Sequence, residues 1–134
     1  MRVLVTGATR GMGLEICRTI SKQCELLLCT SKSEDKSSKL KTEISAECDV
    51  EYFPQDLRDG KLAAKNIADW VREKTDKLDA LILNAGFYTE GDLADFPEKE
   101  MRESLEANFL VNLFLVQEFL DLIKASERRR IVII

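Results

Sequence analysis

Short apolar segments alternate along the chain with longer segments in which apolar residues recur three or four positions apart. The short apolar segments, which predict strands, are residues 2–6, 25–30, 49–54, 78–83 and 130–134. The segments with helical spacing are residues 11–22, 35–46, 60–75 and 98–124. This alternation predicts a parallel sheet, because two parallel strands must be joined by a crossover connection, which is usually a helix.

The strand segments are apolar at nearly every position rather than at every second one. Residues 2–6 read RVLVT, and residues 78–83 read LDALIL. Nearly continuous apolar strands are typical of parallel sheets that are covered by helices on both faces. We therefore predict an α/β fold with three layers, α/β/α, over the whole chain.

Two residues predict where the longer helices begin. Asp59 is a favourable N-cap residue for the helix over 60–75, and Pro97 suits the first turn of the helix over 98–124. Within positions 109–123 the apolar side chains extend almost all the way round the helix. Because a helix of this kind is buried on several sides, we expect the chain to form a homo-oligomer through residues 98–124. The alternative is pairing through the apolar edge strand at residues 131–134.

The composition is that of an ordinary globular protein, with 45% apolar residues, 33% charged residues and a net charge of −4. The acidic balance argues against non-specific binding to nucleic acid, and the apolar segments are too short to cross a membrane. The N-terminus does not resemble a secretory signal, since its short apolar run ends in a glycine turn. These features predict a cytoplasmic location.

The four cysteines and the absence of histidine limit the possible chemistry. No two cysteines form a C-x-x-C pair, so we expect reduced, mostly buried thiols and no metal site. Without histidine, the chain also lacks every catalytic triad that uses histidine as its base.

A glycine-rich turn, TGATRGMG at residues 6–13, follows the first predicted strand and opens the first predicted helix. The free N–H groups and the dipole of a helix N-terminus attract phosphate, and a phosphate reaches the backbone only where side chains are absent. Gly7 would make the tight turn, while Gly11 and Gly13 would let a diphosphate and the neighbouring strand come close. The alternative is a glycine-rich turn that binds no ligand.

With the spacing T-G-x-x-x-G-x-G, this turn resembles that of the short-chain dehydrogenase/reductase family. Further segments resemble the family in the same order: QDLRD (55–59), LDALILNAG (78–86), GDLADFPEKEMRESLEAN (91–108) and NFLVNLFLVQEFL (108–120). The resemblance covers essentially all 134 residues. It implies a Rossmann-type, doubly wound parallel sheet with strand order 3-2-1-4-5 and an NAD(P)-binding domain over residues 1–134. It also implies a partial, truncated chain that ends at the fifth strand.

The resemblance places a dinucleotide on particular residues. The diphosphate and the adenosine ribose would be surrounded by Gly7, Thr9, Arg10, Gly11, Met12 and Gly13. Ser31, at the end of the second strand, belongs to the same predicted site. Asp56 would accept a hydrogen bond from the adenine amino group, with Leu57 beside it. The residues under the ribose next to the nicotinamide would be Asn84, Ala85 and Gly86, and Asn84 would also tie the first and fourth strands together.

The family's chemistry uses a Ser and a Tyr-x-x-x-Lys motif, and this chain contains no such motif. Its two tyrosines, Tyr52 and Tyr88, lie outside the element that carries the family's catalytic tyrosine. Asn108 matches the family's helix-four asparagine, which helps to hold a proton-relay water. Asn112 is the competing candidate, and Val111 departs from the small residue usual three positions after that asparagine.

The second predicted strand ends without the acidic residue that usually binds the ribose hydroxyls of NAD. Arg10 precedes the second glycine, where a basic side chain meets the 2′-phosphate of NADP, so we predict NADP over NAD. The alternative is that Arg10 and Lys32 are ordinary surface charges. The resemblance thus implies an NADP-dependent oxidoreductase that transfers hydride between the nicotinamide and a small carbonyl or alcohol substrate. The alternative function is a cofactor-binding or interaction module without turnover, and we expect the 134 residues alone to be inactive.

Overall fold

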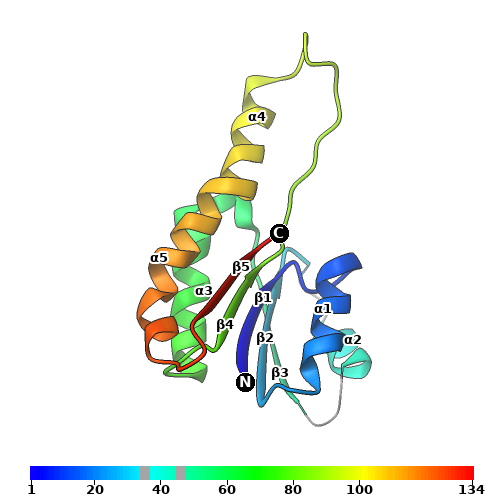
Figure 1. The fold of residues 1–134 in the computed structure, drawn as a ribbon. Coiled ribbons are helices and arrows are strands. Elements are labelled where there is room, and N and C mark those ends of the chain that lie inside the picture. Colours follow the sequence, from blue (N-terminus) through cyan, green and yellow to red (C-terminus); the bar gives the residue numbers. More distant parts are fainter. Residues whose placement is uncertain (34–36, 45–47) are drawn as a thin grey trace.

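The computed structural model describes residues 1–33, 37–44 and 48–134, and its centre is a five-stranded parallel sheet (Figure 1). The strands are β1 (Arg2–Thr6), β2 (Leu26–Ser31), β3 (Asp49–Pro54), β4 (Ala80–Leu83) and β5 (Arg130–Ile133). Their spatial order is β3-β2-β1-β4-β5. The predicted strand order and parallel sheet are therefore confirmed.

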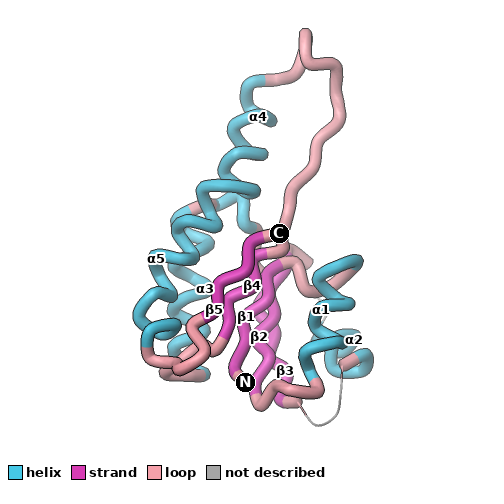
Figure 2. Tube along the Cα trace, in the orientation of Figure 1, coloured by secondary structure: helices cyan, strands magenta, loops and turns pink. Residues whose placement is uncertain are grey.

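Helices cover both faces of the sheet, as predicted (Figures 1 and 2). The helices are α1 (Gly11–Ser21), α2 (Ser37–Glu43), α3 (Lys61–Lys74), α4 (Glu98–Leu105) and α5 (Val111–Lys124). Helices α1 and α2 lie on one face, and α3 and α5 lie on the other, while α4 continues from α5 past the sheet. The helix predicted over 35–46 corresponds to α2, and its predicted ends, residues 35–36 and 45–46, lie outside the described residues.

Two hydrophobic clusters, one on each face, explain why the strands are apolar at consecutive positions. Leu4 packs into the cluster under α3 and α5, whereas Val3 and Val5 pack into the cluster under α1 and α2. Alternate residues of a strand point to opposite faces, so a strand covered on both faces buries every side chain. The same alternation holds in β2, where Leu28 faces the first cluster and Leu27 the second.

The cysteines lie on the α1 and α2 side of the sheet. All four are buried and free: Cys17, Cys24, Cys29 and Cys48. Burial raises the pKa of the Cys24 thiol to about 12, and the pKa of Cys48 is also raised by burial. The expectation that these thiols are buried is confirmed, and their reduced state stays a prediction.

The predicted cap at Asp59 is wrong. After β3 the chain makes a 3-10 turn, η1 (Leu57–Asp59), and the Asp56 carboxylate caps this turn by accepting from the backbone N–H of Arg58. Gly60, with a φ of 53°, then precedes the first residue of α3. Because the extra turn takes up residues 57–59, the Asp59 side chain lies one residue too early to cap the long helix.

The single helix predicted over 98–124 is divided into three parts. A π-helical turn, η2 (Glu106–Leu110), separates α4 from α5. Pro97 occupies the N-cap position of α4, one residue before the first turn in which it was expected. A π-turn adds one residue to the helix at this point and often marks a functional site.

One side of α5 is covered by the sheet and α3, whereas α4 buries none of its residues. Leu115 and Phe119 are fully buried there. The opposite side exposes an apolar stripe made of Met101, Leu105, Phe109, Leu113 and Leu120. None of the helices formed by the described residues combines the length with the apolar character that a bilayer crossing requires.

Candidate cofactor-binding site

A cavity of about 710 Å³ opens at the carboxyl ends of β1, β2, β3 and β4. Its walls include all twelve predicted cofactor-binding residues: Gly7, Thr9, Arg10, Gly11, Met12, Gly13, Ser31, Asp56, Leu57, Asn84, Ala85 and Gly86. The order of the sheet reverses between β1 and β4, and ligands of open α/β sheets bind outside the strand ends at such a switch point. The structure thus brings the whole predicted set to one place.

The β1–α1 turn is built from close contacts between backbone segments. Gly7 has a φ of 69°, and its N–H donates to the carbonyl of Thr30 on β2 at 2.8 Å. A Cβ atom added to Gly13 would lie 2.2 Å from the Gly7 carbonyl oxygen, and one added to Gly7 would lie 2.8 Å from the Ala85 Cα. Gly7 and Gly13 are therefore required by the packing of the turn itself.

Gly11 stands apart from the other two glycines. It has a φ of 51°, and a Cβ atom at this position would have no described atom within 4 Å. Among the described residues, the N-cap residue of α1, Arg10, makes no side-chain cap hydrogen bond. The start of α1 therefore leaves backbone N–H groups beside open space, as a bound diphosphate needs.

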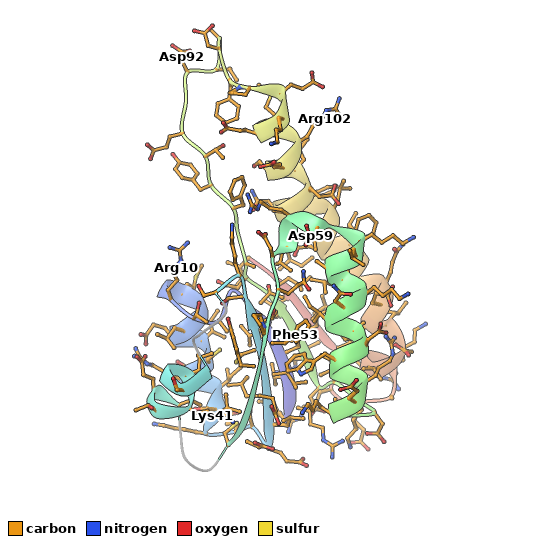
Figure 3. All side chains as sticks on the ribbon, turned by 180° about the vertical axis from the view of Figure 1, so that it is seen from behind. Arg10, Lys41, Phe53, Asp59, Asp92 and Arg102 are labelled. Atoms are coloured by element: carbon orange, nitrogen blue, oxygen red, sulfur yellow. The ribbon has the colours of Figure 1, made fainter. Side chains whose placement is uncertain are left out.

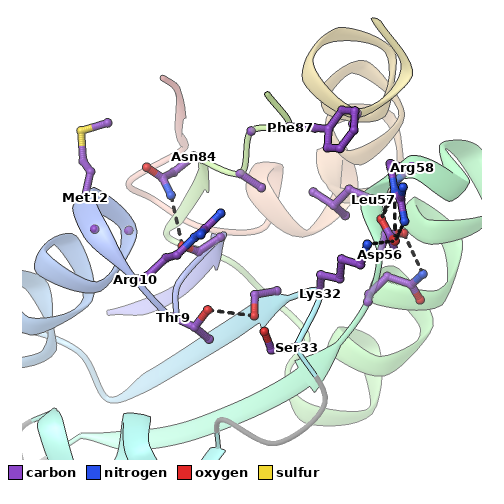
Figure 4. Close-up of a pocket in the computed structure, with 18 residues that line it drawn as sticks. Thr9, Arg10, Met12, Lys32, Ser33, Asp56, Leu57, Arg58, Asn84 and Phe87 are labelled. Carbon is purple, nitrogen blue, oxygen red and sulfur yellow. Dashed lines mark hydrogen bonds and ion pairs between the residues drawn. The ribbon is translucent and has the colours of Figure 1, made fainter. Parts of the chain in front are cut away.

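Asn84 links the end of β4 to the end of β1, which confirms its predicted tying role. Its Nδ2 donates to the carbonyl oxygens of Thr6 at 3.1 Å and Gly7 at 3.3 Å. The Thr6 Oγ1 in turn accepts from the backbone N–H groups of Asn84 at 3.1 Å and Ala85 at 3.0 Å. These contacts fix the floor of the cavity (Figure 4).

A chain of hydroxyl groups orders the end of β2. The Thr9 Oγ1 donates to the Ser31 Oγ at 3.1 Å, and the Ser31 Oγ pairs with the Tyr52 hydroxyl at 2.8 Å. Tyr52 also donates to the carbonyl of Ser33, and burial raises the pKa of its phenol. Tyr52 thus supports the β2 wall of the cavity.

The end of β3 carries an ionised carboxylate between two cations. The Asp56 Oδ2 lies 2.6 Å from the Arg58 Nη2 and 3.2 Å from the Lys32 Nζ. Hydrogen bonds from Arg58 hold the pKa of Asp56 well below its usual range. Arg10 also lines the cavity beside Lys32, so two basic side chains lie on the wall near the end of β2.

Asn108 lies in η2 and reaches the segment that follows β4. Its Nδ2 donates to the Phe87 carbonyl at 2.7 Å, and its Oδ1 accepts from the Phe87 N–H at 2.6 Å. The buried Asn112 donates from its Nδ2 to the carbonyl of Asn108 at 2.9 Å. Asn108 does not form part of the cavity wall, and its catalytic role stays a prediction.

The cavity wall also contains residues that sequence reasoning left out of the site. These residues are Ser33, Gln55, Arg58, Phe87 and Ala107, together with Lys32, which was named only in the alternative to the NADP prediction. Arg58 was available as a signal, because it lies inside the QDLRD motif. The other positions carry no pattern that distinguishes them from neighbouring residues.

A comparison with protein-family models decides the family. The model described as short chain dehydrogenase matches residues 1–134. The chain belongs to the short-chain dehydrogenase family. Short-chain dehydrogenase/reductase 1 of Saponaria officinalis is 33% identical over 114 residues, which cover 79% of this chain and 36% of the relative.

Solved structures of short-chain dehydrogenases share the fold. A metagenomic short-chain oxidoreductase in complex with NADP superposes with a TM-score of 0.88 at 26% identity, covering 98% of this chain and 59% of the other. An NADPH-bound carbonyl reductase from chicken fatty liver gives a TM-score of 0.77 at 29% identity, covering 92% and 48%. The chain spans about a third to a half of the length of the curated relatives that it matches.

Proposed function

We propose that residues 1–134 are the cofactor-binding domain of an NADP-dependent short-chain dehydrogenase/reductase. Its reaction would transfer hydride between the nicotinamide and a small carbonyl or alcohol substrate, and NADP, when bound, supplies the hydride chemistry. The observation that carries this proposal is the cavity at the sheet's switch point, whose walls contain all twelve predicted residues.

Each part of the cavity has a part of the dinucleotide to hold. The β1–α1 turn binds the diphosphate, because Gly11 leaves its face open and the α1 N–H groups point outward. Asp56 accepts from the adenine amino group. Asn84 and its neighbours support the ribose next to the nicotinamide, while Asn108 fixes the backbone of Phe87 beside the reacting end.

The preference for NADP over NAD rests on charge at the end of β2. The strand and the residues after it, Leu26 to Ser33, contain no acidic side chain, and both Arg10 and Lys32 line the adjacent wall. A guanidinium or ammonium group forms a charge-assisted contact with a 2′-phosphate, which NAD lacks. The NADP and NADPH complexes of the two related structures support a nicotinamide dinucleotide as the cofactor.

Three further features extend the proposal. The 134 residues contain no Tyr-x-x-x-Lys motif, so we expect them to bind cofactor without turnover. The exposed apolar stripe on α4, η2 and α5 supports the proposal that the chain forms a homo-oligomer through this surface. The four buried free thiols fit a reducing compartment such as the cytoplasm.

Calorimetric titration of NADP and NAD into the protein tests the proposal. We expect tighter binding of NADP, and we expect Arg10→Met to weaken NADP by about tenfold while changing NAD little, because only the 2′-phosphate contact is lost. Arg102→Met is the matched control, since Arg102 pairs with Glu98 on α4 away from the cavity. Equal affinities for the two cofactors, or tighter NAD, would contradict the NADP assignment.

A further inference from the structure

One guanidinium group, that of Arg58, joins three segments at the adenine end of the cavity. It pairs with Asp56 in its own turn, lies 5.5 Å from the centroid of the Phe87 ring and reaches Glu103 of α4 at 3.8 Å. Figure 4 shows Arg58 between Asp56 and Phe87, on the cavity wall. The proposed dinucleotide function gives this side chain no role.

The contact with Asp56 fixes both oxygens of the carboxylate. The Arg58 Nε lies 3.1 Å from each oxygen, and the Nη2 lies 2.6 Å from Oδ2. The backbone N–H of Arg58 donates to Oδ1 at 3.1 Å. A planar fork of this kind restricts the orientation of a carboxylate far more than a single point charge does.

Lys32, the second cation on Asp56, is a poorer anchor. It makes one contact at 3.2 Å, and its side chain is 66% exposed, against 35% for Arg58. An exposed lysine pair contributes little to the orientation of its partner, because its long side chain keeps most of its freedom. Arg58 is therefore the group that determines how the Asp56 carboxylate faces the cavity.

The other two contacts keep Arg58 itself in place. Phe87 is held by its two backbone hydrogen bonds to Asn108, so the ring above the guanidinium has a fixed base. Glu103 approaches the guanidinium from α4. Because Arg58 is braced from two elements outside its own turn, a rotation that released Asp56 would also break both of these contacts.

We propose that Arg58 is a positioning residue for base recognition, which holds the Asp56 carboxylate so that it accepts from the 6-amino group of adenine. The inference rests on the proposed dinucleotide function. It predicts base selectivity: hypoxanthine carries an oxygen acceptor in place of the 6-amino group, and a fixed carboxylate cannot pair with that oxygen. A carboxylate that is free to turn away discriminates less between the two bases.

Binding of NADP and of its hypoxanthine counterpart, nicotinamide hypoxanthine dinucleotide phosphate, tests the inference by calorimetry. The unmodified protein is expected to prefer NADP by about tenfold, as for the loss of a charge-assisted hydrogen bond. In Arg58→Met the preference is expected to fall below about threefold. Asp56→Asn is expected to show the smallest preference between the two nucleotides, since an amide presents either an acceptor or a donor to the base.

Arg72→Met is the matched control. Arg72 also bridges two elements, with contacts to Glu118 and Asp121 of α5, and its side chain is 37% exposed, but it lies outside the cavity wall. The base preference is expected to stay at the unmodified value in this variant. An equal fall of the base preference in Arg72→Met and Arg58→Met would overturn the inference, because the loss of any surface arginine would then lower this preference.

The remaining outcomes separate this inference from the proposed function. Binding of neither nucleotide to the unmodified protein overturns the proposed function and the inference with it. Binding without base preference, or an unchanged preference in Arg58→Met, overturns the inference alone, as does an equal loss of affinity for both nucleotides. If Arg58→Met fails to fold, Arg58→Lys keeps the charge and removes the fork: a lowered preference supports the inference, and an unchanged one overturns it.

Discussion

Asp56 shows how a single side chain is fixed before any ligand arrives. The cap of η1, the Arg58 fork and the Lys32 contact all use its carboxylate. All three interactions are stronger with the ionised form, and the hydrogen bonds from the Arg58 side chain above all hold the pKa of Asp56 below its usual range. A residue proposed to bind the cofactor thus also makes contacts that stabilise the fold.

The contribution of Asp56 to folding can be measured from how the free energy of unfolding depends on pH. A carboxyl group with a lowered folded-state pKa stabilises the fold above its unfolded value of about 3.9, and this contribution is lost as the pH falls through the lower, folded-state value. We expect Asp56→Asn to lower the free energy of unfolding by about 1–2 kcal/mol at pH 7, and we expect this difference to shrink below about pH 4.

Urea titrations followed by circular dichroism at several pH values measure this difference. Asp69→Asn is the control, because Asp69 is exposed on α3. A difference between Asp56→Asn and the unmodified protein that stays constant down to pH 2 would show that ionisation of Asp56 contributes nothing to folding.

At the scale of elements, the β1–α1 turn combines two kinds of glycine. Gly13 is required because a side chain there would meet the backbone of Gly7 and the amide of Asn84. Gly11 is required only by its positive φ, since its side faces open space. The spacing of the motif gives no sign of this difference, because it records which positions lack a side chain and not the reason.

Alanine substitutions distinguish the two glycines. We expect Gly13→Ala to cost about 3 kcal/mol of unfolding free energy, because neither the Gly7 carbonyl nor the Asn84 amide can move aside. Gly11→Ala is expected to cost about 1 kcal/mol, the strain of a left-handed backbone. Chemical denaturation measures both costs, and equal costs for the two variants would contradict the packing argument.

The strands and the order of the helices could be predicted from the sequence, because strands that are buried on both faces are apolar at nearly every position. Residues 49–54, for example, were predicted as a strand and form β3 with the same bounds. The departures come from backbone geometry. The 3-10 turn before α3 and the π-turn between α4 and α5 each change a helix locally. Neither changes the spacing of the apolar residues enough for the turn to be recognised in the sequence.

The candidate site divides in the same way. Its glycine turn and its Asn-Ala-Gly segment stand in recognisable motifs, so their place on the cavity wall could be predicted. Arg58 lies inside the QDLRD motif and could have been found there, but Ala107 could not, since its place on the wall depends on how η1 and η2 pack against each other. Residues of this kind become visible only when tertiary contacts are known.

At the scale of the whole molecule, one helical surface is left without a partner among the described residues. The side chains of the apolar stripe on α4, η2 and α5 are exposed to solvent. The segment between β4 and α4 also extends from the body of the molecule, with Asp92 near its tip (Figure 3). Solvent exposure of this much apolar side chain favours association.

Light scattering coupled to size-exclusion chromatography tests the proposed homo-oligomer. We expect a mass above that of the 15.2 kDa chain, and we expect the pair Phe109→Glu and Leu113→Glu to shift it to the monomer, because charges would face each other across the interface. Leu62→Glu is the control, as Leu62 is equally exposed on α3. A monomer at high concentration in the unmodified protein would exclude the oligomer.

The central position of β1 affects how the chain acquires its structure during synthesis. β1 pairs with β2 on one side, but its other neighbour, β4, begins at Ala80, and the Asn84 contacts to Thr6 span 78 positions. At a translation rate of about 5–20 residues per second, the first strand to leave the ribosome waits several seconds for its second neighbour. The same contacts set a length limit of about 90 residues. A nascent chain shorter than this cannot form the Asn84 contacts at the cavity floor, and we expect it not to retain nucleotide.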